Sequence, residues 1–175
     1  MGKGTVITAL REKHKNWVFP PSCTTRESRP GEIEGETYFF ISKEEFLKRV
    51  GRDEFLEHAE VHGGNLYGTL KKPLVTGVEQ GKIVIREFDV QGFLQVREKL
   101  PKEYYTSIFL KPAEGVEVLG ERIRHRAPIT DEELVRRMES MKNELKLEHL
   151  YDYTVISRQG AIRQMVEDIE HIIVS

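Results

Sequence analysis

Short β-type segments alternate with segments of helical spacing along most of this chain, and that alternation limits the fold more than any other feature. Strands are predicted over residues 17–19, 38–41, 82–88, 106–110 and 151–156. Helices are predicted over 1–14, 69–80, 116–123 and 131–147, after Ser42 and after Gly160, with a short helix or turn over 53–59. Strands that alternate with helices indicate an α/β fold with a parallel sheet.

Local signals support several of these elements. The run KIVIREF at 82–88 is largely apolar and β-branched, which is typical of a strand buried in a parallel sheet. Ser42 precedes Glu45, and Thr130 precedes Glu133, by the three residues of a capping box. We therefore expect a helix to begin after each hydroxyl residue.

Composition excludes several classes of protein. With 175 residues the chain can form one domain, or one domain with a small insert. A formal net charge of −2 gives no general attraction to nucleic acid or to an anionic membrane. No apolar run approaches the roughly 18 residues of a membrane span. A single cysteine, Cys23, and the lack of a signal peptide predict a cytoplasmic protein.

Residues 22–40, SCTTRESRPGEIEGETYFF, are the strongest functional signal. Arg26 and Arg29 lie three residues apart, and hydroxyl groups flank them at Ser22 and Tyr38. The planar guanidinium group can give a phosphate two parallel, charge-assisted hydrogen bonds. This segment therefore predicts a phosphate-monoester site, and a polar turn with solvated arginines is the alternative.

The first residues contain a weaker signal. GKGT at 2–5 corresponds to the second half of the phosphate-binding loop G-x-x-x-x-G-K-[ST], placed before a helix. The first glycine of that loop and the strand that should precede it are absent. We expect this to weaken the chain's stability and its ATP site, and to reflect an artificial start at Met1.

Taken together, these motifs resemble the guanylate kinases, whose pattern S-x-x-T-R-x-x-R-x-G-E-x-x-G-x-x-Y is matched at every fixed position by residues 22–38. The resemblance implies a P-loop kinase core, with a parallel sheet flanked by helices, plus a small mixed nucleotide-monophosphate-binding insert and a short lid. The core is expected at 1–20 and 81–175, the lid at about 123–133 and the GMP-binding subdomain at 21–80.

The resemblance also implies a set of GMP-binding residues. They are Ser22, Arg26, Arg29, Tyr38, Glu57, Tyr67, Thr69 and Asp89. Glu57 would accept hydrogen bonds from the N1–H and amino group of guanine, a pair of donors that adenine lacks. The segment HGGNLYGT at 62–69 resembles the family's G-N-x-Y-G-[ST], with Gly64 as an extra glycine.

A second set is expected to bind ATP and to transfer the phosphoryl group. Gly2, Lys3, Gly4 and Thr5 would line the phosphate loop, and Lys3 is expected to be catalytic. The arginines at 122, 126 and 137 match the lid pattern R-x-x-x-R…E-x-x-x-x-R, so Arg122, Arg126 and Arg137 are also assigned to catalysis, the first two with ATP contacts. Mg²⁺ is the expected cofactor, held through water by Glu87, where the family's D-x-D-x-Q-G has Asp, with Thr5 as a further candidate ligand.

The implied reaction is ATP + GMP ⇌ ADP + GDP. GMP and ATP are the expected partners of a monomer or homodimer that binds no nucleic acid and no membrane. Two alternatives stay open: a catalytically impaired module that binds GMP or a protein, and a kinase for dGMP or another monophosphate. Ser157 stands where the family usually has an asparagine near adenine, which leaves the adenine contacts open.

Overall fold

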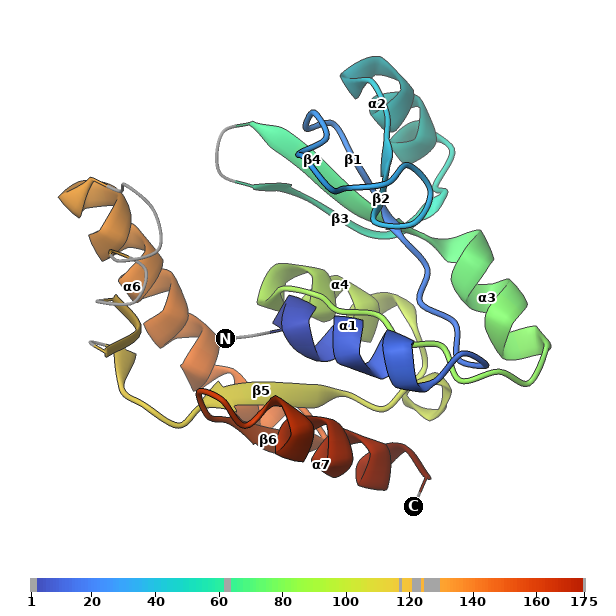
Figure 1. Cartoon of the computed structure of the whole chain (residues 1–175). Coiled ribbons are helices and arrows are strands. Elements are labelled where there is room, and N and C mark those ends of the chain that lie inside the picture. The colour runs from blue at the N-terminus through green and yellow to red at the C-terminus, as the bar shows by residue number, and fades with distance from the viewer. Residues whose placement is uncertain (1–2, 62–63, 117, 121–123, 125–129, 175) are drawn as a thin grey trace. The chain divides into compact units, whose positions relative to one another are not determined.

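The structure is a computed structural model that describes residues 3–61, 64–116, 118–120, 124 and 130–174. The chain forms two compact units, Met1–Leu10 with Tyr105–Ser175 and Arg11–Tyr104. Helix α1 (Lys3–Lys13) begins in the first of these and ends in the second (Figure 1). It begins almost at the first residue, as the sequence predicted.

The unit Arg11–Tyr104 is built on a mixed four-stranded sheet. Its elements are β1 (Ser22–Thr24), β2 (Tyr38–Phe40), α2 (Lys43–Gly51), β3 (Phe55–Val61), β4 (Asn65–Leu70), α3 (Lys71–Glu79), α4 (Val90–Lys99) and the 3₁₀ turn η1 (Lys102–Tyr104). The strand order is β2-β1-β4-β3 (Figure 1). β1 is parallel to β2 and antiparallel to β4, and β4 is antiparallel to β3. The central position of β1 explains why all three of its residues are buried.

Aromatic packing holds α2 against this sheet. Phe46 of α2 stacks on Phe55 of β3 with ring centroids 4.5 Å apart, and Cys23 and Leu66 complete the cluster. A Cβ atom on Gly68 would lie 2.8 Å from Phe55 Cδ1 and 3.0 Å from Phe46 Cζ. The rings therefore pack directly on the bare backbone of β4. Ser42 caps α2 as predicted, because its hydroxyl accepts from the Glu45 backbone N–H at 3.1 Å.

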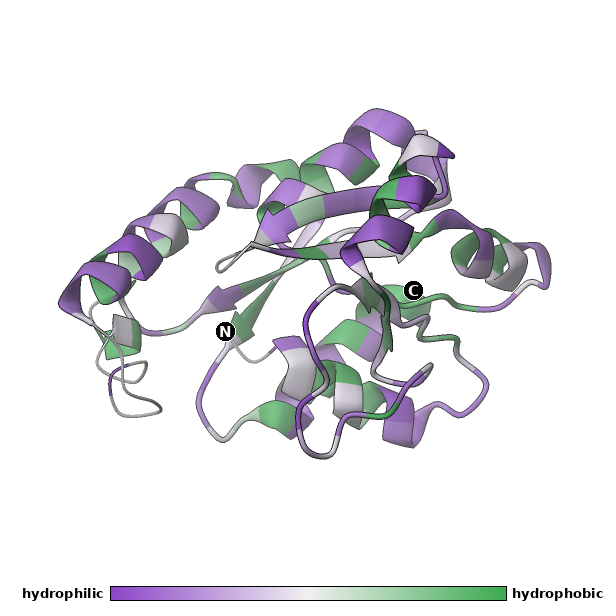
Figure 2. Ribbon diagram, turned by 90° about the horizontal axis from the view of Figure 1, so that it is seen from above, coloured by the Kyte–Doolittle hydropathy of each residue, from purple (hydrophilic) through white to green (hydrophobic). Residues whose placement is uncertain are grey.

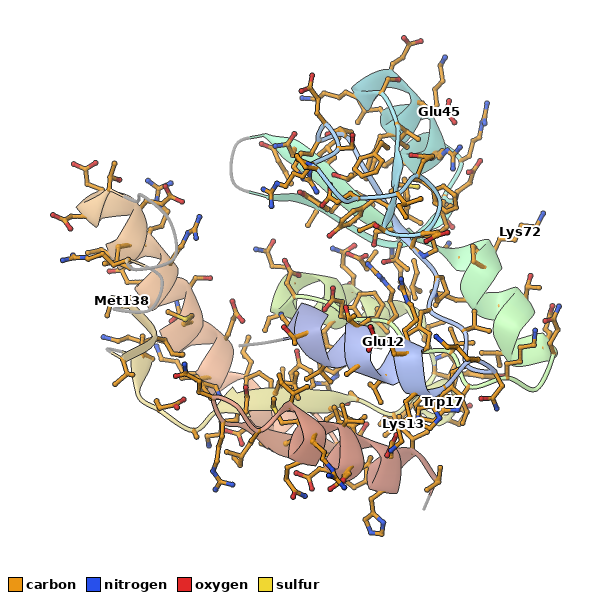
Figure 3. The ribbon with its side chains drawn as sticks, in the orientation of Figure 1. Glu12, Lys13, Trp17, Glu45, Lys72 and Met138 are labelled. Atoms are coloured by element: carbon orange, nitrogen blue, oxygen red, sulfur yellow. The ribbon has the colours of Figure 1, made fainter. Side chains whose placement is uncertain are left out.

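Three predicted elements of this unit are wrong. The segment 53–59 does not form the predicted short helix or turn: strand β3 spans 55–61, because six residue pairs with β4 outweigh the local preference of Leu, Glu and Ala for helix. Residues 82–88 and 17–19 form no strand: they meet in one parallel bridge, Val18 with Val84, flanked by two hydrogen bonds. Only one pairing partner reaches each segment within the described part of this unit, so the ladder stays one bridge long. Trp17 (Figure 3) is buried beside this bridge and stacks on His14.

The other unit contains a two-stranded parallel sheet. Its elements are β5 (Ile108–Pro112), α6 (Asp131–Lys146), the 3₁₀ turn η2 (Glu148–Leu150), β6 (Tyr153–Ser157) and α7 (Ile162–Val174). The predicted strands at 106–110 and 151–156 are thus present, each displaced by about two residues. α7, the helix predicted after Gly160, buries Met165, Val166 and Ile169 on one face.

Helix α6 is polar along most of its length, with Leu134 as its buried residue (Figure 2). The Thr130 hydroxyl accepts from the Glu133 backbone N–H at 3.2 Å, which confirms the predicted capping box. Met138 of α6 (Figure 3) packs against Gly120, whose Cβ would lie 2.8 Å from its sulfur atom. Residues 116 and 118–120 of the helix predicted at 116–123 are helical, and 117 and 121–123 lie outside the described residues. Among the described helices, none has the length and apolarity required to cross a membrane.

Candidate functional site

Arg26 is held at the edge of the sheet by a carboxylate and a phenol. Its Nη1 and Nη2 atoms donate to the two carboxylate oxygens of Glu32 at 3.0 and 2.8 Å, and its Nε donates to the Tyr67 hydroxyl at 3.1 Å. The hydrogen bond with Glu32, and after it the one with Tyr67, raises the pKa of Arg26. The same hydrogen bond between Arg26 and Glu32 lowers the pKa of Glu32. The guanidinium group of Arg26 therefore already makes a bidentate contact with a carboxylate. A phosphate group could accept the same pair of hydrogen bonds.

Aromatic rings surround the same guanidinium group. Arg26 lies over the rings of Tyr38 and Phe40, 5.6 and 5.9 Å from their centroids. Tyr38 packs edge-on to Tyr67 at 5.9 Å. Burial raises the pKa of Tyr38, and the negative charge of Glu87 adds to that shift. Tyr38 therefore stays protonated beside Arg26, and the Tyr67 hydroxyl accepts from Arg26 Nε.

Arg29 is placed by the turn that follows Arg26. Its backbone N–H donates to Oε2 of Glu32 at 2.7 Å, and Gly31 takes φ 85°, which favours glycine. Its side chain is exposed. Glu32 therefore ties together both arginines of the segment, one through its guanidinium group and the other through its backbone.

Deeper in the sheet, two hydroxyls and an arginine form a polar network. Ser22 on β1 and Thr69 on β4 are 3 % and 0 % exposed, and their hydroxyl oxygens are 3.3 Å apart. Arg86 donates from Nε to Thr69 Oγ1 at 3.2 Å, from Nη1 to the Pro20 carbonyl at 3.2 Å, and from Nη2 to Ser22 Oγ. Burial lowers the pKa of Arg86, and the charges of Glu87 and Glu57 oppose that shift.

Glu57 lies next to this network on β3, opposite Thr69. It is 8 % exposed, and its burial raises the pKa of its carboxyl group, while hydrogen bonding to the Thr69 side chain and the charge of Arg86 act in the other direction. A Cβ atom on Gly92 would lie 2.8 Å from Glu57 Oε2. A carboxylate that is buried, hydrogen-bonded on one side and backed by bare backbone is held in one orientation, as a base-recognition group must be.

The two acids after the segment 82–86 differ in exposure. Asp89 is exposed and caps α4, because its Oδ1 accepts from the Gly92 backbone N–H at 2.8 Å. Glu87 is half-buried, and its charge acts on Tyr38 and Arg86. Among the described residues, no group of three His, Cys, Asp or Glu side chains could hold a metal ion.

The residues predicted to bind ATP belong to the other unit. Lys3, Gly4 and Thr5 form the first turn of α1, and a Cβ atom on Gly4 would meet nothing within 4 Å. Arg137 on α6 is paired with Glu133 one turn earlier. Gly2, Arg122 and Arg126 lie outside the described residues. The predicted GMP-binding residues and Glu87 thus belong to one compact unit, and the described residues predicted to bind ATP belong to the other.

Three residues of the GMP-side set were not predicted. Glu32 was part of the matched motif, but only its hydrogen bonds show that it orients Arg26. Gly92 follows Gln91 in the segment that resembles the family's D-x-D-x-Q-G. A glycine is needed there because the Glu57 carboxylate lies close to its backbone. In the sequence, Arg86 is a cation inside a largely apolar run, and that is the one feature that could have singled it out.

Known proteins resemble this chain over nearly its whole length. The sequence model of the family described as "Guanylate kinase" matches residues 1–175. The chain belongs to the guanylate kinase family. A guanylate kinase of Clostridium perfringens (strain SM101 / Type A) is 41 % identical over 174 residues, which cover 99 % of this chain and 78 % of that protein. One from Thermotoga maritima is 40 % identical over 174 residues, which cover 99 % of this chain and 79 % of that protein.

The fold agrees as well. The crystal structure of guanylate kinase from Anaplasma phagocytophilum matches with a TM-score of 0.75 and 32 % sequence identity, over 97 % of this chain and 79 % of that chain. The expected P-loop kinase fold, with helices, a parallel sheet and a mixed insert, is therefore confirmed.

Proposed function

We propose that this guanylate kinase family member transfers the γ-phosphoryl group of ATP to GMP, giving ADP and GDP in purine nucleotide metabolism. The observation that carries the proposal is that a phosphate-type cluster and a buried carboxylate share one sheet. Arg26 is hydrogen-bonded to Tyr67 of β4, and Glu57 is paired with Thr69, two residues further along the same strand. A nucleoside monophosphate, with its phosphate and its base at opposite ends, could contact both groups.

The acceptor phosphate would lie against Arg26, Arg29, Tyr38 and Tyr67. Arg26 is oriented by Glu32, so little side-chain entropy is lost when it binds an oxyanion. Arg29 is exposed and adds a second fork, and the hydroxyl groups of Tyr38 and Tyr67 add further donors. Holding the phosphate in one orientation supplies the proximity on which phosphoryl transfer depends.

The base would be read by Glu57, with Ser22, Thr69 and Asp89 around it. An ionised carboxylate accepts two hydrogen bonds, and guanine presents N1–H and an amino group side by side. Adenine has an acceptor at N1, so two acceptors would face each other. The burial of Glu57 makes that mismatch costly, because water cannot compensate for it.

The donor nucleotide would bind residues of the other unit. Gly2, Lys3, Gly4 and Thr5 would cradle the ATP phosphates at the N-terminus of α1, where backbone N–H groups favour anions. Lys3, Arg122, Arg126 and Arg137 would neutralise charge that spreads over the transferred phosphoryl group. Arg137 would exchange its partner Glu133 for a phosphate oxygen.

Nucleotide kinases of this kind use Mg²⁺, and the residues present fit that ion. Mg²⁺ is commonly held by one or two carboxylates, waters and substrate phosphates, so it needs no cluster of acids. Glu87, which is half-buried, would supply the carboxylate through water. When bound, the ion neutralises phosphate charge, and the chain's own residues orient the two substrates.

The division into a core at 1–20 and 81–175, with a lid at about 123–133, and a GMP-binding subdomain at 21–80 is part of this proposal. So is the cytoplasmic location, which rests on the single Cys23, a free thiol buried in the core. The compact units have their boundaries at residues 10–11 and 104–105 instead. Limited proteolysis with and without GMP should protect residues 21–80 if that segment is the substrate-ordered part.

The test of the reaction separates binding from turnover. Calorimetry measures GMP binding to the full chain, and a coupled assay measures ADP formation with GMP, dGMP, AMP or CMP as acceptor. We expect tight GMP binding and GMP-dependent ADP formation with little response to AMP or CMP. GMP binding without ADP formation would favour the impaired module, and equal use of AMP would overturn the assignment of Glu57.

A further inference from the structure

Arg86 is the cation of the polar network beneath the proposed base site. It is partly buried, and its three hydrogen bonds from the described residues go to neutral oxygens: the hydroxyls of Ser22 and Thr69 and the carbonyl of Pro20. A guanidinium group has five N–H donors. Those three bonds leave one further N–H on each terminal nitrogen. The charges of Glu87 and Glu57 offset part of the cost of burying this cation, but these three hydrogen bonds go to neutral groups.

Thr69 joins Arg86 to Glu57. The Thr69 hydroxyl accepts from Arg86 Nε at 3.2 Å and is hydrogen-bonded to the Glu57 carboxylate. The charge of each group also acts on the ionisation of the other. The Thr69 hydroxyl thus lies between the guanidinium group of Arg86, which can donate several hydrogen bonds, and the carboxylate of Glu57, which can accept two. Ser22, 3.3 Å from Thr69, lies on the Arg86 side of this arrangement.

A donor beside a double acceptor complements the hydrogen-bonding edge of guanine. The O6 atom of guanine accepts, and the neighbouring N1–H and amino group donate. Adenine reverses the first two positions, with a donating amino group at C6 and an accepting N1. Arginine is the side chain most often found donating to guanine O6 and N7 in nucleic-acid complexes, because its fork fits two adjacent acceptors.

We propose that Arg86 is a specificity-determining residue that donates hydrogen bonds to guanine O6 while Glu57 accepts from N1–H and the amino group. This inference rests on the proposed function, since it names a further contact in the same site. Arg86 then adds an attraction for guanine and a donor–donor repulsion against adenine. The discrimination comes from both sides of one base edge rather than from Glu57 alone.

A purely structural role for Arg86 makes a different prediction. Arg86 links Pro20 and Ser22 to Thr69, so it also fastens β1 to β4. If that were its whole purpose, removing it would weaken binding of every nucleotide by the same factor. If it reads O6, the loss depends on the atom at position 6 of the base.

The experiment varies both the atom at position 6 of the base and the residue at position 86. The ligands are GMP and 6-thioguanosine monophosphate, which keeps N1–H and the amino group but replaces O6 with a weakly accepting sulfur. Calorimetry on the full chain compares wild type with Arg86→Met. We expect wild type to prefer GMP by about 10-fold, as for the loss of a charge-assisted hydrogen bond. In Arg86→Met the two ligands should bind within about 2-fold of each other.

Two controls complete the design. Arg52→Met removes an exposed arginine of the same unit, whose Nη1 lies 3.7 Å from Glu54, and should leave both affinities unchanged. Inosine monophosphate keeps O6 and N1–H but lacks the amino group. Arg86→Met should therefore weaken GMP and inosine monophosphate equally, whereas Glu57→Gln should reduce the preference for GMP over inosine monophosphate.

The outcomes are distinct. Equal losses of GMP and the thio-analogue in Arg86→Met would overturn the inference in favour of a structural role. If that variant does not fold, wild type decides: no preference for GMP over the thio-analogue overturns the inference, and a preference that Arg86→Lys reduces supports it. If wild type binds no GMP at all, the proposed function fails first, and this inference fails with it.

Discussion

A Cβ atom on Gly92 would lie 2.8 Å from Oε2 of Glu57 and 3.2 Å from its Cδ, closer than neighbouring atoms can remain. Gly92 lies in the first turn of α4, and Glu57 lies on β3. The glycine of the D-x-Q-G segment is therefore required by a carboxylate 35 residues earlier in the chain. Any side chain at this position displaces the group proposed to read guanine.

Gly92→Ala should weaken GMP binding more than it affects folding. Alanine favours the helix over glycine by about 1 kcal/mol, which offsets part of the strain. Displacement of a bidentate base contact costs about 1–3 kcal/mol, so we expect a rise in the Kd for GMP of about 10-fold. The matched control is Gly51→Ala at the end of α2, where a Cβ atom meets nothing within 4 Å. Unchanged GMP affinity in Gly92→Ala would contradict the assignment of Glu57.

Glu57→Gln should change the pH dependence of stability. Burial raises the pKa of Glu57 above its ordinary value of 4.5, so the folded protein binds this proton more tightly than the unfolded chain does. Ionisation of Glu57 therefore costs stability as pH rises from about 4.5 through the raised pKa. Gln cannot ionise, so the Tm of the variant relative to wild type should increase over that interval, by about 2–4 °C for each kcal/mol that the ionisation costs.

Thermal unfolding between pH 4 and pH 8 measures this difference. Glu79→Gln, an exposed position at the end of α3, controls for the loss of one negative charge. A difference between Glu57→Gln and wild type that stays flat across the whole range would show that burial does not raise this pKa. The same ionisation should increase GMP affinity as pH rises, since only the carboxylate accepts both hydrogen bonds.

Arg29→Ala should leave folding intact and nearly abolish phosphate acceptance. The Arg29 side chain is exposed, and the hydrogen bond it gives Glu32 comes from the backbone, which alanine retains. We expect a Tm within about 1 °C of wild type and a loss in kcat/KM for GMP of about 100-fold, as for two charge-assisted hydrogen bonds. Arg52→Ala is the exposed control. A large fall in Tm with normal activity would instead indicate a structural role.

Cys23 should resist thiol reagents in the folded protein. Its side chain is fully buried, and burial raises the pKa of the Cys23 thiol to about 11. The reactive thiolate is therefore scarce at pH 8, and access is blocked. Labelling should be at least about 100-fold slower than in urea, because lost thiolate alone accounts for that factor. Since Cys23 is the single cysteine, all labelling reports on it. Equal rates with and without urea would contradict a closed core.

Much of this protein could be predicted from the sequence where the deciding interactions are local. Ser42 and Thr130 cap their helices through a backbone N–H three residues later, so the spacing of two residue types is sufficient. The Arg26 segment was recognisable because all residues of its motif lie within positions 22–38. The helix after Gly160 was predicted from helical spacing alone and is present as α7.

Contacts between distant residues required the tertiary structure. Residues 55–61 have good helix formers, and only the ladder with β4 makes them a strand. Residues 82–88 have strand composition, but pairing depends on a neighbour, and a single bridge to Val18 forms within their unit. The proposed roles of Arg86 and Gly92 depend on contacts with Ser22, Thr69 and Glu57, which lie between 17 and 64 residues away in the sequence. Sequence spacing encodes interactions within one turn, whereas the closing of long loops is decided by burial and pairing across the whole unit.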